Sequence, residues 1–313
     1  MTRLLVTGVA GSLARLTALA LQRDGHDVAG VDYRRRPKDH PDALPYTQAN
    51  YNKTRIEDVV RRFRPETLLH LGRVGNLKLA VGKRFDLNVV GSGKLFELAQ
   101  KYDVARVVVL STFHIYGAHP ANHVPIAEDE PLRSGADFPE LSDAVQLDNL
   151  ASQWAYRYAR PETVVLRPTN VIGPDIKNAI STYLRQRTVA RVLGFDPMWQ
   201  FIHQTDVVEA IRLAATTPKL IGVYNIAANG TLPFSRALEE CGARAWPIPG
   251  PLATQLLRTM GRFGPALPPY LVDFCRYPVI INDARFRAET GFVPKVGVLE
   301  ALRSTVSTVD RRD

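Results

Sequence analysis

A strand that runs into a glycine turn at the start of the chain limits the fold more than any other feature. Residues 4–14 read LLVTGVAGSLA, and the pattern that follows predicts a helix over 11–23. Gly8 and Gly11 would let the backbone approach a pyrophosphate, whose charge then meets the free N–H groups at the helix N-terminus. Ala14 stands where the fingerprint has a third glycine or an alanine. The turn predicts a dinucleotide site, with an ordinary tight turn as the weaker alternative.

An acidic residue follows the turn at the spacing of the same fingerprint. Asp32 comes directly after the predicted strand 27–31, and a carboxylate there accepts hydrogen bonds from the adenosine ribose hydroxyls. Asp32 favours NAD, because the 2′-phosphate of NADP would face its negative charge. Arg34, Arg35 and Arg36 are placed to neutralise that phosphate. We predict NAD as the cofactor, with NADP as the alternative.

Short apolar runs alternate with helical patterns through the first half of the chain. Further runs stand at 67–71, 106–110 and 163–166, which is typical of βαβ units and a parallel sheet. After Pro168, segments marked by proline replace this rhythm. We predict an α/β fold: a Rossmann-type, doubly wound parallel sheet formed by residues 1–168 and rejoined by 204–226. A smaller C-terminal substrate lobe is expected within residues 169–313.

Charge and cysteine content narrow the classes of partner. The 40 Lys and Arg exceed the 31 Asp and Glu by 9, but the basic residues form short scattered groups without interleaved aromatics. This permits phosphate-bearing ligands and does not predict nucleic-acid binding. Cys241 and Cys275 form neither a disulfide framework nor a metal site. Since no signal-like N-terminus or apolar run of about 18 residues is present, we expect a cytoplasmic protein without a membrane partner.

Seven motifs resemble those of the extended short-chain dehydrogenase/reductases, the nucleotide-sugar epimerases and dehydratases typified by UDP-glucose 4-epimerase. They are Thr7–Ala14 (TGxxGxxG/A), His70–Arg73 (HLAA), Asn88–Gly93 (NVxGT), Ser111–Gly117 (SSxxVYG), Leu166–Pro174 (LRPxNVYGP), Phe201–Val207 (FIHVDDV) and Phe286–Pro294 (LGFxP). The resemblance implies chemistry with NAD on a nucleotide sugar or a similar hydroxylated small molecule. It also implies a homodimer, formed through helices around 88–102 and 145–158.

The resemblance assigns candidate binding residues. For the cofactor they are Gly8, Gly11, Ser12, Leu13, Asp32, Tyr33, Arg34, Asn50, Tyr51, Leu71, Gly72, Arg73, Asn88, Ser111 and Pro168. For the substrate they are His114, Asn170 and His203. Two of the candidate cofactor residues depart from the family pattern, since Arg73 replaces a small residue and Asn50 stands where an aspartate is common.

The acid/base pair of the family is missing from this chain. Family members use a Tyr as acid or base and a Lys four residues later that lowers the pKa of the Tyr. Residues 149–153, NLASQ, align with the family's KLAAE, so that Val145 takes the Tyr position and Asn149 the Lys position. Tyr156 is no replacement, because a rise of about 1.5 Å per residue places it roughly 16 Å farther along the helix.

Thr112 keeps the family's Ser/Thr position and is the remaining candidate catalytic residue. His114 and Tyr116 follow it, and either would replace the lost acid/base if it points into the cleft, although packing is favoured for Tyr116.

Two function classes stay open. The first is an enzyme of the epimerase/dehydratase type without the standard Tyr/Lys chemistry.

The second class is a catalytically lapsed dinucleotide-binding sensor or partner subunit. It would need an exposed apolar surface, and residues 251–270 carry Leu252, Leu256, Leu257 and Met260 at helical spacing. A place in the core of the substrate lobe is the favoured interpretation of that segment. The glycine turn and Thr112 favour the enzyme.

Overall fold

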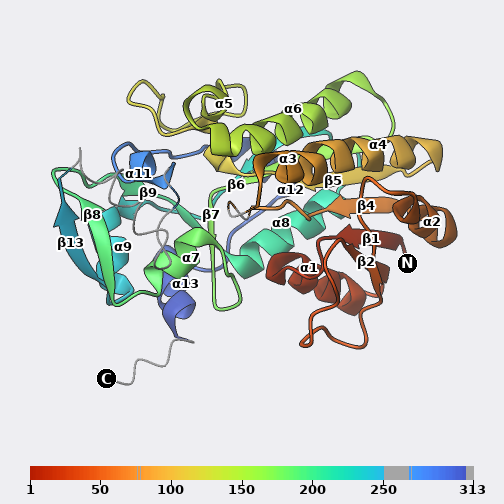
Figure 1. Cartoon of the computed structure of the whole chain (residues 1–313), viewed down its shortest axis with the longest axis horizontal. Coiled ribbons are helices and arrows are strands. Elements are labelled where there is room, and N and C mark those ends of the chain that lie inside the picture. The colour runs from red at the N-terminus through yellow and green to blue at the C-terminus, as the bar shows by residue number, and fades with distance from the viewer. Residues whose placement is uncertain (76, 78, 250–267, 269, 308–313) are drawn as a thin grey trace.

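A parallel sheet of seven strands forms the centre of the computed structural model, which describes residues 1–75, 77, 79–249, 268 and 270–307 (Figure 1). The strand order is β11-β6-β5-β4-β1-β2-β3, and every neighbouring pair is parallel. The strands are β1 (Arg3–Thr7), β2 (Asp27–Asp32), β3 (Tyr46–Gln48), β4 (Thr67–His70), β5 (Arg106–Leu110), β6 (Glu162–Pro168) and β11 (Gly222–Ile226). The predicted doubly wound parallel sheet is confirmed.

Helices cover both faces of this sheet, as Figure 1 shows. One face carries α1 (Ser12–Arg23), α8 (Gln204–Thr216) and α12 (Ala284–Thr290), and the other carries α2 (Thr54–Phe63), α4 (Gly91–Lys101) and α6 (Ser142–Arg157). Successive side chains of a strand point to opposite faces. Leu4 and Val6 therefore pack in the core under α1, while Leu5 packs in the core under α4. Burial on both faces explains why the strands read as continuous apolar runs.

The strand order reverses between β1 and β4, which pair directly although β2 and β3 come between them in the sequence. From β1 the chain turns into α1 on one face. From β4 it passes through α3 (Val81–Phe85) and η1 (Asp86–Val90) into α4 on the other. A reversal of this kind opens a crevice at the carboxyl ends of the strands, where ligands of such sheets bind.

A smaller lobe lies beyond the carboxyl ends of the sheet strands (Figure 1). Its strands pair as β7 (Asn170–Ile172) with β10 (Phe201–His203), β9 (Met198–Trp199) with β12 (Leu232–Pro233), and β8 (Thr188–Val192) with β13 (Arg244–Ile248). Its helices are α7 (Ala179–Leu184), α9 (Phe234–Glu240), α11 (Leu271–Phe274) and α13 (Val298–Val306). Its core is rich in aromatic rings, with Trp199 stacked on Phe234 at 4.3 Å between centroids.

Three short elements lie between β5 and α6 in the chain, namely η2 (Phe113–Tyr116), α5 (Ser134–Asp137) and η3 (Pro139–Leu141). Side chains from η2 and η3, such as Phe113 and Leu141, pack in the core of the smaller lobe. The candidate partner surface at Leu252, Leu256, Leu257 and Met260 lies outside the described residues. Within the described ranges, no helix combines the length and the apolar character needed to cross a membrane. In the same ranges, no three His, Cys, Asp or Glu side chains are grouped to hold a metal ion.

Candidate functional site

A cavity of about 730 Å³ opens at the carboxyl ends of the strands, beside the reversal between β1 and β4. Its walls come from the glycine turn, from the ends of β2, β4, β5 and β6, and from the smaller lobe. Small-molecule sites usually enclose about 300–1,000 Å³. The cavity therefore has the place and the size expected of a ligand site.

Most of the residues predicted from the sequence line this cavity. They are Gly8, Gly11, Ser12, Leu13, Asp32, Tyr33, Arg34, Leu71, Gly72, Arg73, Ser111, Thr112, His114, Pro168 and Asn170. The ones that do not line it are Asn50, Tyr51, Asn88, Val145, Asn149 and His203.

The glycine turn presents backbone to the cavity. Gly8 has a φ of +82°, and a Cβ atom on it would lie 2.4 Å from the Cα atom of Gly72 in the loop after β4. Gly11 is the N-cap of α1 and supplies no side-chain cap. The first N–H groups of α1 come from Ser12 and Leu13, both in the cavity wall. A pyrophosphate fits such a helix start, because these donors and the helix dipole both favour negative charge.

Tyr51 and Asn50 lie behind the cavity wall. The Tyr51 side chain is fully buried, and its hydroxyl lies 2.6 Å from the point where a Cβ atom on Gly72 would be. Burial raises the pKa of this hydroxyl, so that it stays protonated. The side-chain oxygen Oδ1 of Asn50 accepts a hydrogen bond from the Asn52 N–H at 3.3 Å within a turn. Neither side chain is among those that line the cavity, and their predicted contact with the cofactor stays a prediction.

Asn88 and His203 hold backbone in place. The Asn88 side chain accepts from the Val74 N–H at 2.7 Å and donates to the Val74 carbonyl at 3.0 Å, which shapes the loop that carries Arg73. His203 is the N-cap of α8, where its Nδ1 accepts from the Thr205 N–H. Asn88 thus holds the loop that follows β4, and His203 holds the start of α8. Their predicted contacts with cofactor and substrate stay predictions.

Thr112 and His114 form a hydrogen-bonded pair in the cavity wall, with 2.9 Å between Thr112 Oγ1 and His114 Nδ1. The imidazole is enclosed by Phe113, Phe274 and Tyr270, at 4.3, 5.0 and 5.5 Å between ring centroids. His114 Nε2 is buried and has no hydrogen-bond partner among the described residues. One nitrogen is thus oriented by Thr112, while the other has no hydrogen-bond partner among the described residues.

Burial sets the charge of this histidine. Burial, together with the nearby charge of Arg73, lowers the pKa of His114 to about 3. His70, which ends β4 and contacts Thr7 and Ser92, has its pKa lowered to about 4 by burial alone. Both imidazoles are neutral at pH 7.

We expect acid to destabilise the protein through these two histidines. Because an unfolded histidine titrates near pH 6.5, the unfolded state binds more protons between that pH and the folded pKa. The free energy of unfolding should therefore fall as the pH drops below about 6.5, by up to about 1.4 kcal/mol per pH unit for each histidine. Urea denaturation at pH 7, 6 and 5 measures this slope. In the variant His114→Phe, this slope should be smaller by the contribution of one histidine. An unchanged slope would contradict the lowered pKa of His114.

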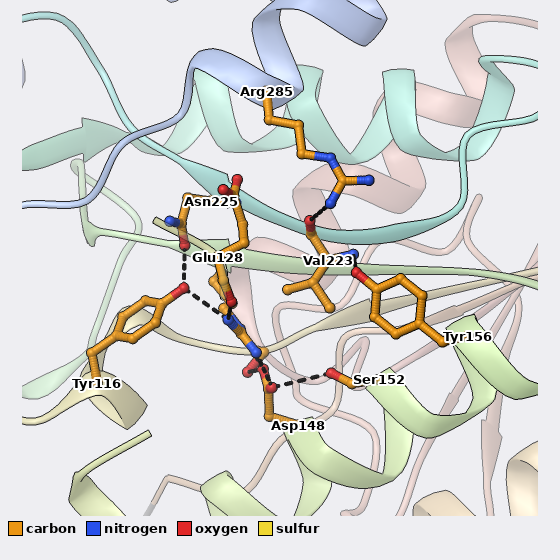
Figure 2. Close-up of polar contacts among 10 residues, drawn as sticks. Tyr116, Glu128, Asp148, Ser152, Tyr156, Val223, Asn225 and Arg285 are labelled. Atoms are coloured by element: carbon orange, nitrogen blue, oxygen red, sulfur yellow. Dashed lines mark hydrogen bonds and ion pairs between the residues drawn. The ribbon is translucent and has the colours of Figure 1, made fainter. Parts of the chain in front are cut away.

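The two positions that the sequence alignment assigns to the family's acid/base pair, Val145 and Asn149, do not line the cavity. Val145 packs with Ile115 and Ala144, and a Cβ atom on Gly135 of α5 would lie 3.5 Å from Val145 Cγ1. Asn149 is exposed on α6. Tyr156 lies at the far end of α6, where its hydroxyl accepts from the Val223 N–H at 3.4 Å (Figure 2).

A buried polar network that the sequence did not predict lies next to the cavity (Figure 2). Arg167 at the end of β6 donates to both carboxylate oxygens of Asp148 on α6, at 3.0 and 2.6 Å. Its Nη1 donates to the Tyr116 hydroxyl at 2.8 Å, and that hydroxyl donates to the Asn225 side chain on β11. Ser111 in the cavity wall donates to Asp148 at 2.5 Å. The network ties the end of β5 to α6, β6 and β11.

The smaller lobe supplies wall residues that the sequence did not reveal, among them Lys177, Ile180 and Tyr270. Tyr270 contacts His114 across a long chain separation, and no motif marks it. Asn178, also in the wall, is the N-cap of α7 and accepts from the Ser181 N–H at 2.7 Å. Asparagine is one of the preferred N-cap residues, and α7 begins directly after Asn178.

The model of the NAD dependent epimerase/dehydratase family matches residues 4–227. The chain belongs to this family. The prediction of NAD as the cofactor is thereby confirmed at the level of the family, and membership supports an enzyme. The glycine turn, the uncapped start of α1 and the cavity fit such a cofactor.

Relatives of this family member include proteins of known and unknown activity. The uncharacterized protein Rv0501 of Mycobacterium tuberculosis is 29% identical over 263 residues, which is 82% of this chain and 69% of the relative. The UDP-glucose 4-epimerase of Mycolicibacterium smegmatis is 30% identical over 185 residues, which is 55% of this chain and 57% of that epimerase. The solved UDP-glucose 4-epimerase of Thermus thermophilus, in complex with NAD, has a TM-score of 0.77 at 23% identity and covers 97% of both chains. That similarity shows the same fold.

Proposed function

We propose that this protein is an NAD-dependent enzyme of the epimerase/dehydratase type that acts on a nucleotide sugar. One observation carries the proposal. His114 Nε2 and Asn170 Oδ1 belong to cavity-lining residues, and neither atom has a hydrogen-bond partner among the described residues. A buried polar group left without a partner costs about 1–3 kcal/mol. Two such groups beside one cavity are explained by a hydroxylated ligand that completes their hydrogen bonds.

The substrate class draws support from the names of similar proteins. Two relatives are a UDP-glucose 4-epimerase and a probable UDP-glucuronate 4-epimerase. One solved neighbour, MoeE5, was captured with NAD and with UDP-glucuronic acid or UDP-glucose. We place the nucleotide sugar at the His114 end of the cavity and the dinucleotide along the glycine turn.

The chain's own residues then have separate roles. Ser12 and Leu13 N–H groups bind the pyrophosphate, and Asn170 accepts a hydrogen bond from a sugar hydroxyl. When bound, NAD supplies a nicotinamide ring that takes up and returns hydride. His114 stands in for the absent tyrosine: with its Nδ1 proton donated to Thr112, Nε2 accepts the proton of the reacting hydroxyl. Because burial and Arg73 oppose the imidazolium, we expect slow turnover.

The test measures turnover and cofactor binding side by side. We expect UDP-glucose or UDP-glucuronic acid to give slow formation of NADH or of the epimer, detected by absorbance and by chromatography. Loss of a positioned acid/base group costs about 10²–10⁴ in rate. His114→Phe should show such a loss and keep its NAD affinity, while His123→Phe, a change at an exposed histidine, should behave like the wild type. Equal rates in the two variants would remove His114 from the mechanism.

A catalytically lapsed binding protein is the second candidate, and one observation favours it. Val145 is buried beneath α5 and Asn149 is exposed, so that neither family position offers a polar group to the cavity. This candidate predicts tight NAD binding without turnover of any nucleotide sugar. A homodimer through α4 and α6, a cytoplasmic location and the division into residues 1–168 and 169–313 remain predictions from the sequence.

A further inference from the structure

The carboxylate expected to bind the adenosine ribose is already fully engaged. Asp32 has no exposed surface, and it accepts hydrogen bonds from the Ala10 N–H at 3.0 Å and the Arg34 N–H at 2.9 Å. The Arg34 guanidinium adds two more, from Nε to Oδ1 at 3.1 Å and from Nη2 to Oδ2 at 3.0 Å. A carboxylate has about four lone-pair sites. These four donors use all of them, and the carboxylate has no acceptor site left for a ribose hydroxyl.

Arg34 itself faces the cavity. Its side chain lies in the cavity wall with 46% of its surface exposed, and Nη2 is 3.6 Å from the point where a Cβ atom on Gly11 would lie. Nη1 has no hydrogen-bond partner among the described residues, since the guanidinium meets Asp32 through Nε and Nη2. The Tyr46 hydroxyl donates to the Arg34 carbonyl at 2.8 Å, which holds this stretch of backbone against β3. A positioned cation with free N–H groups thus stands where the bare carboxylate was predicted.

We propose that Arg34 makes the ribose end of this site accept a 2′-phosphate, so that the chain binds NADP as well as NAD. The bidentate pair cancels the charge of Asp32, which removes the repulsion that excludes a 2′-phosphate from an acidic site. Among the described residues, the guanidinium keeps the N–H groups of Nη1 and the second N–H of Nη2 free, and one from each nitrogen can bind phosphate oxygens in the fork geometry that arginine offers. For NAD, the ribose hydroxyls have to displace Arg34 from Asp32. Arg34 therefore favours the binding of NADP and opposes the binding of NAD.

Neighbouring arginines provide matched controls. Arg35 carries the same charge on the same loop but is exposed and not part of the cavity wall. The Arg36 guanidinium donates a hydrogen bond from Nη2 to Oδ1 of Asp42 at 2.6 Å. Net charge alone would make Arg34→Ala and Arg35→Ala equivalent, whereas a positioned guanidinium makes them different.

The experiment is calorimetric titration of the purified, nucleotide-stripped chain with NAD⁺ and NADP⁺. A charge-assisted hydrogen bond contributes about 1.5–3 kcal/mol, which corresponds to about 10–100-fold in affinity. We expect the wild type to bind both nucleotides. Arg34→Ala should weaken NADP⁺ about 10–100-fold while NAD⁺ binds as well or better, and Arg35→Ala should match the wild type. Arg34→Lys, which keeps a charge beside Asp32 but lacks the fork, should weaken NADP⁺ by an intermediate factor.

Three results would overturn the proposal: no NADP⁺ binding by a wild type that binds NAD⁺, equal weakening of both nucleotides in Arg34→Ala, or equal effects of Arg34→Ala and Arg35→Ala. Competition between 2′,5′-ADP and ADP repeats the comparison without the nicotinamide end. The inference depends on the cofactor site of the proposed function. Absence of binding by either nucleotide would reject both, whereas binding of NAD⁺ alone rejects only the role of Arg34.

Discussion

Replacing Arg167 with methionine is expected to lower the free energy of unfolding by about 3–5 kcal/mol, the cost of removing one partner from a buried ion pair. Arg167 and Asp148 have 4% and 0% of their side-chain surface exposed. Methionine fills much of the same volume but leaves the Asp148 carboxylate without its cation. The Ser111 hydroxyl, at 2.5 Å, would be the one short hydrogen bond that remains to it in the described network.

Urea denaturation of the variant, of Asp148→Asn and of the double variant measures this cost and its origin. The double variant should be more stable than the sum of the two losses predicts, because it leaves no unpaired buried charge. Arg61→Ala is the surface control. Its ion pair with Asp58 is about half exposed on both sides, and such pairs contribute roughly 0.2–1 kcal/mol. A loss below about 1 kcal/mol for Arg167→Met would show that the network stabilises the fold little.

The same network explains a limit of prediction from sequence. Arg167 and Asp148 each lie inside a recognised motif or helix, and nothing in their local patterns indicates that they meet. Their pairing depends on how α6 packs on β6, which is a tertiary contact. The strands themselves were predictable, because burial on both faces leaves a continuous apolar run at each of β1, β2, β4, β5 and β6.

The cavity was predictable to the extent that local geometry determines it. Gly8 and Asp32 could be placed from the sequence because a turn and a strand end are local features, and both line the cavity. The engagement of Asp32 by Arg34 was not foreseen, since the sequence shows that the two are close but not which way the guanidinium turns. Tyr270 could not be assigned to the site either, because its contact with His114 joins distant parts of the chain.

Two residues that the resemblance assigns to the cofactor do not line the cavity. The resemblance assigns Asn88 and Tyr51 to the cofactor. In the structure, Asn88 holds the Val74 backbone and Tyr51 lies behind Gly72, and a contact of either with the cofactor stays a prediction. Motif position reports which residues matter around a site. It does not distinguish a residue that touches a ligand from one that supports the loop in contact with it.

Replacing Gly8 with alanine is expected to abolish cofactor binding and to destabilise the fold by about 2–5 kcal/mol, the sum of two effects. The φ of +82° is strained for any residue with a Cβ atom. In addition, the new methyl group would lie 2.4 Å from Gly72 Cα and 2.8 Å from Gly72 N, both backbone atoms of the adjacent loop. Either β1 and β4 separate at this point or the turn changes shape, and in both cases the start of α1 moves relative to Asp32.

Gly25 allows the two effects to be separated. It has nearly the same φ, +85°, but a Cβ atom on it would meet nothing within 4 Å. Gly25→Ala should therefore show the backbone strain alone, about 1–2 kcal/mol, and should bind NAD⁺ like the wild type in calorimetry. Gly8→Ala should lose more stability and give no binding heat. If both variants bound NAD⁺ equally well, the close approach of Gly8 and Gly72 would not be a requirement of the site, and the cofactor would have to lie elsewhere in the cavity.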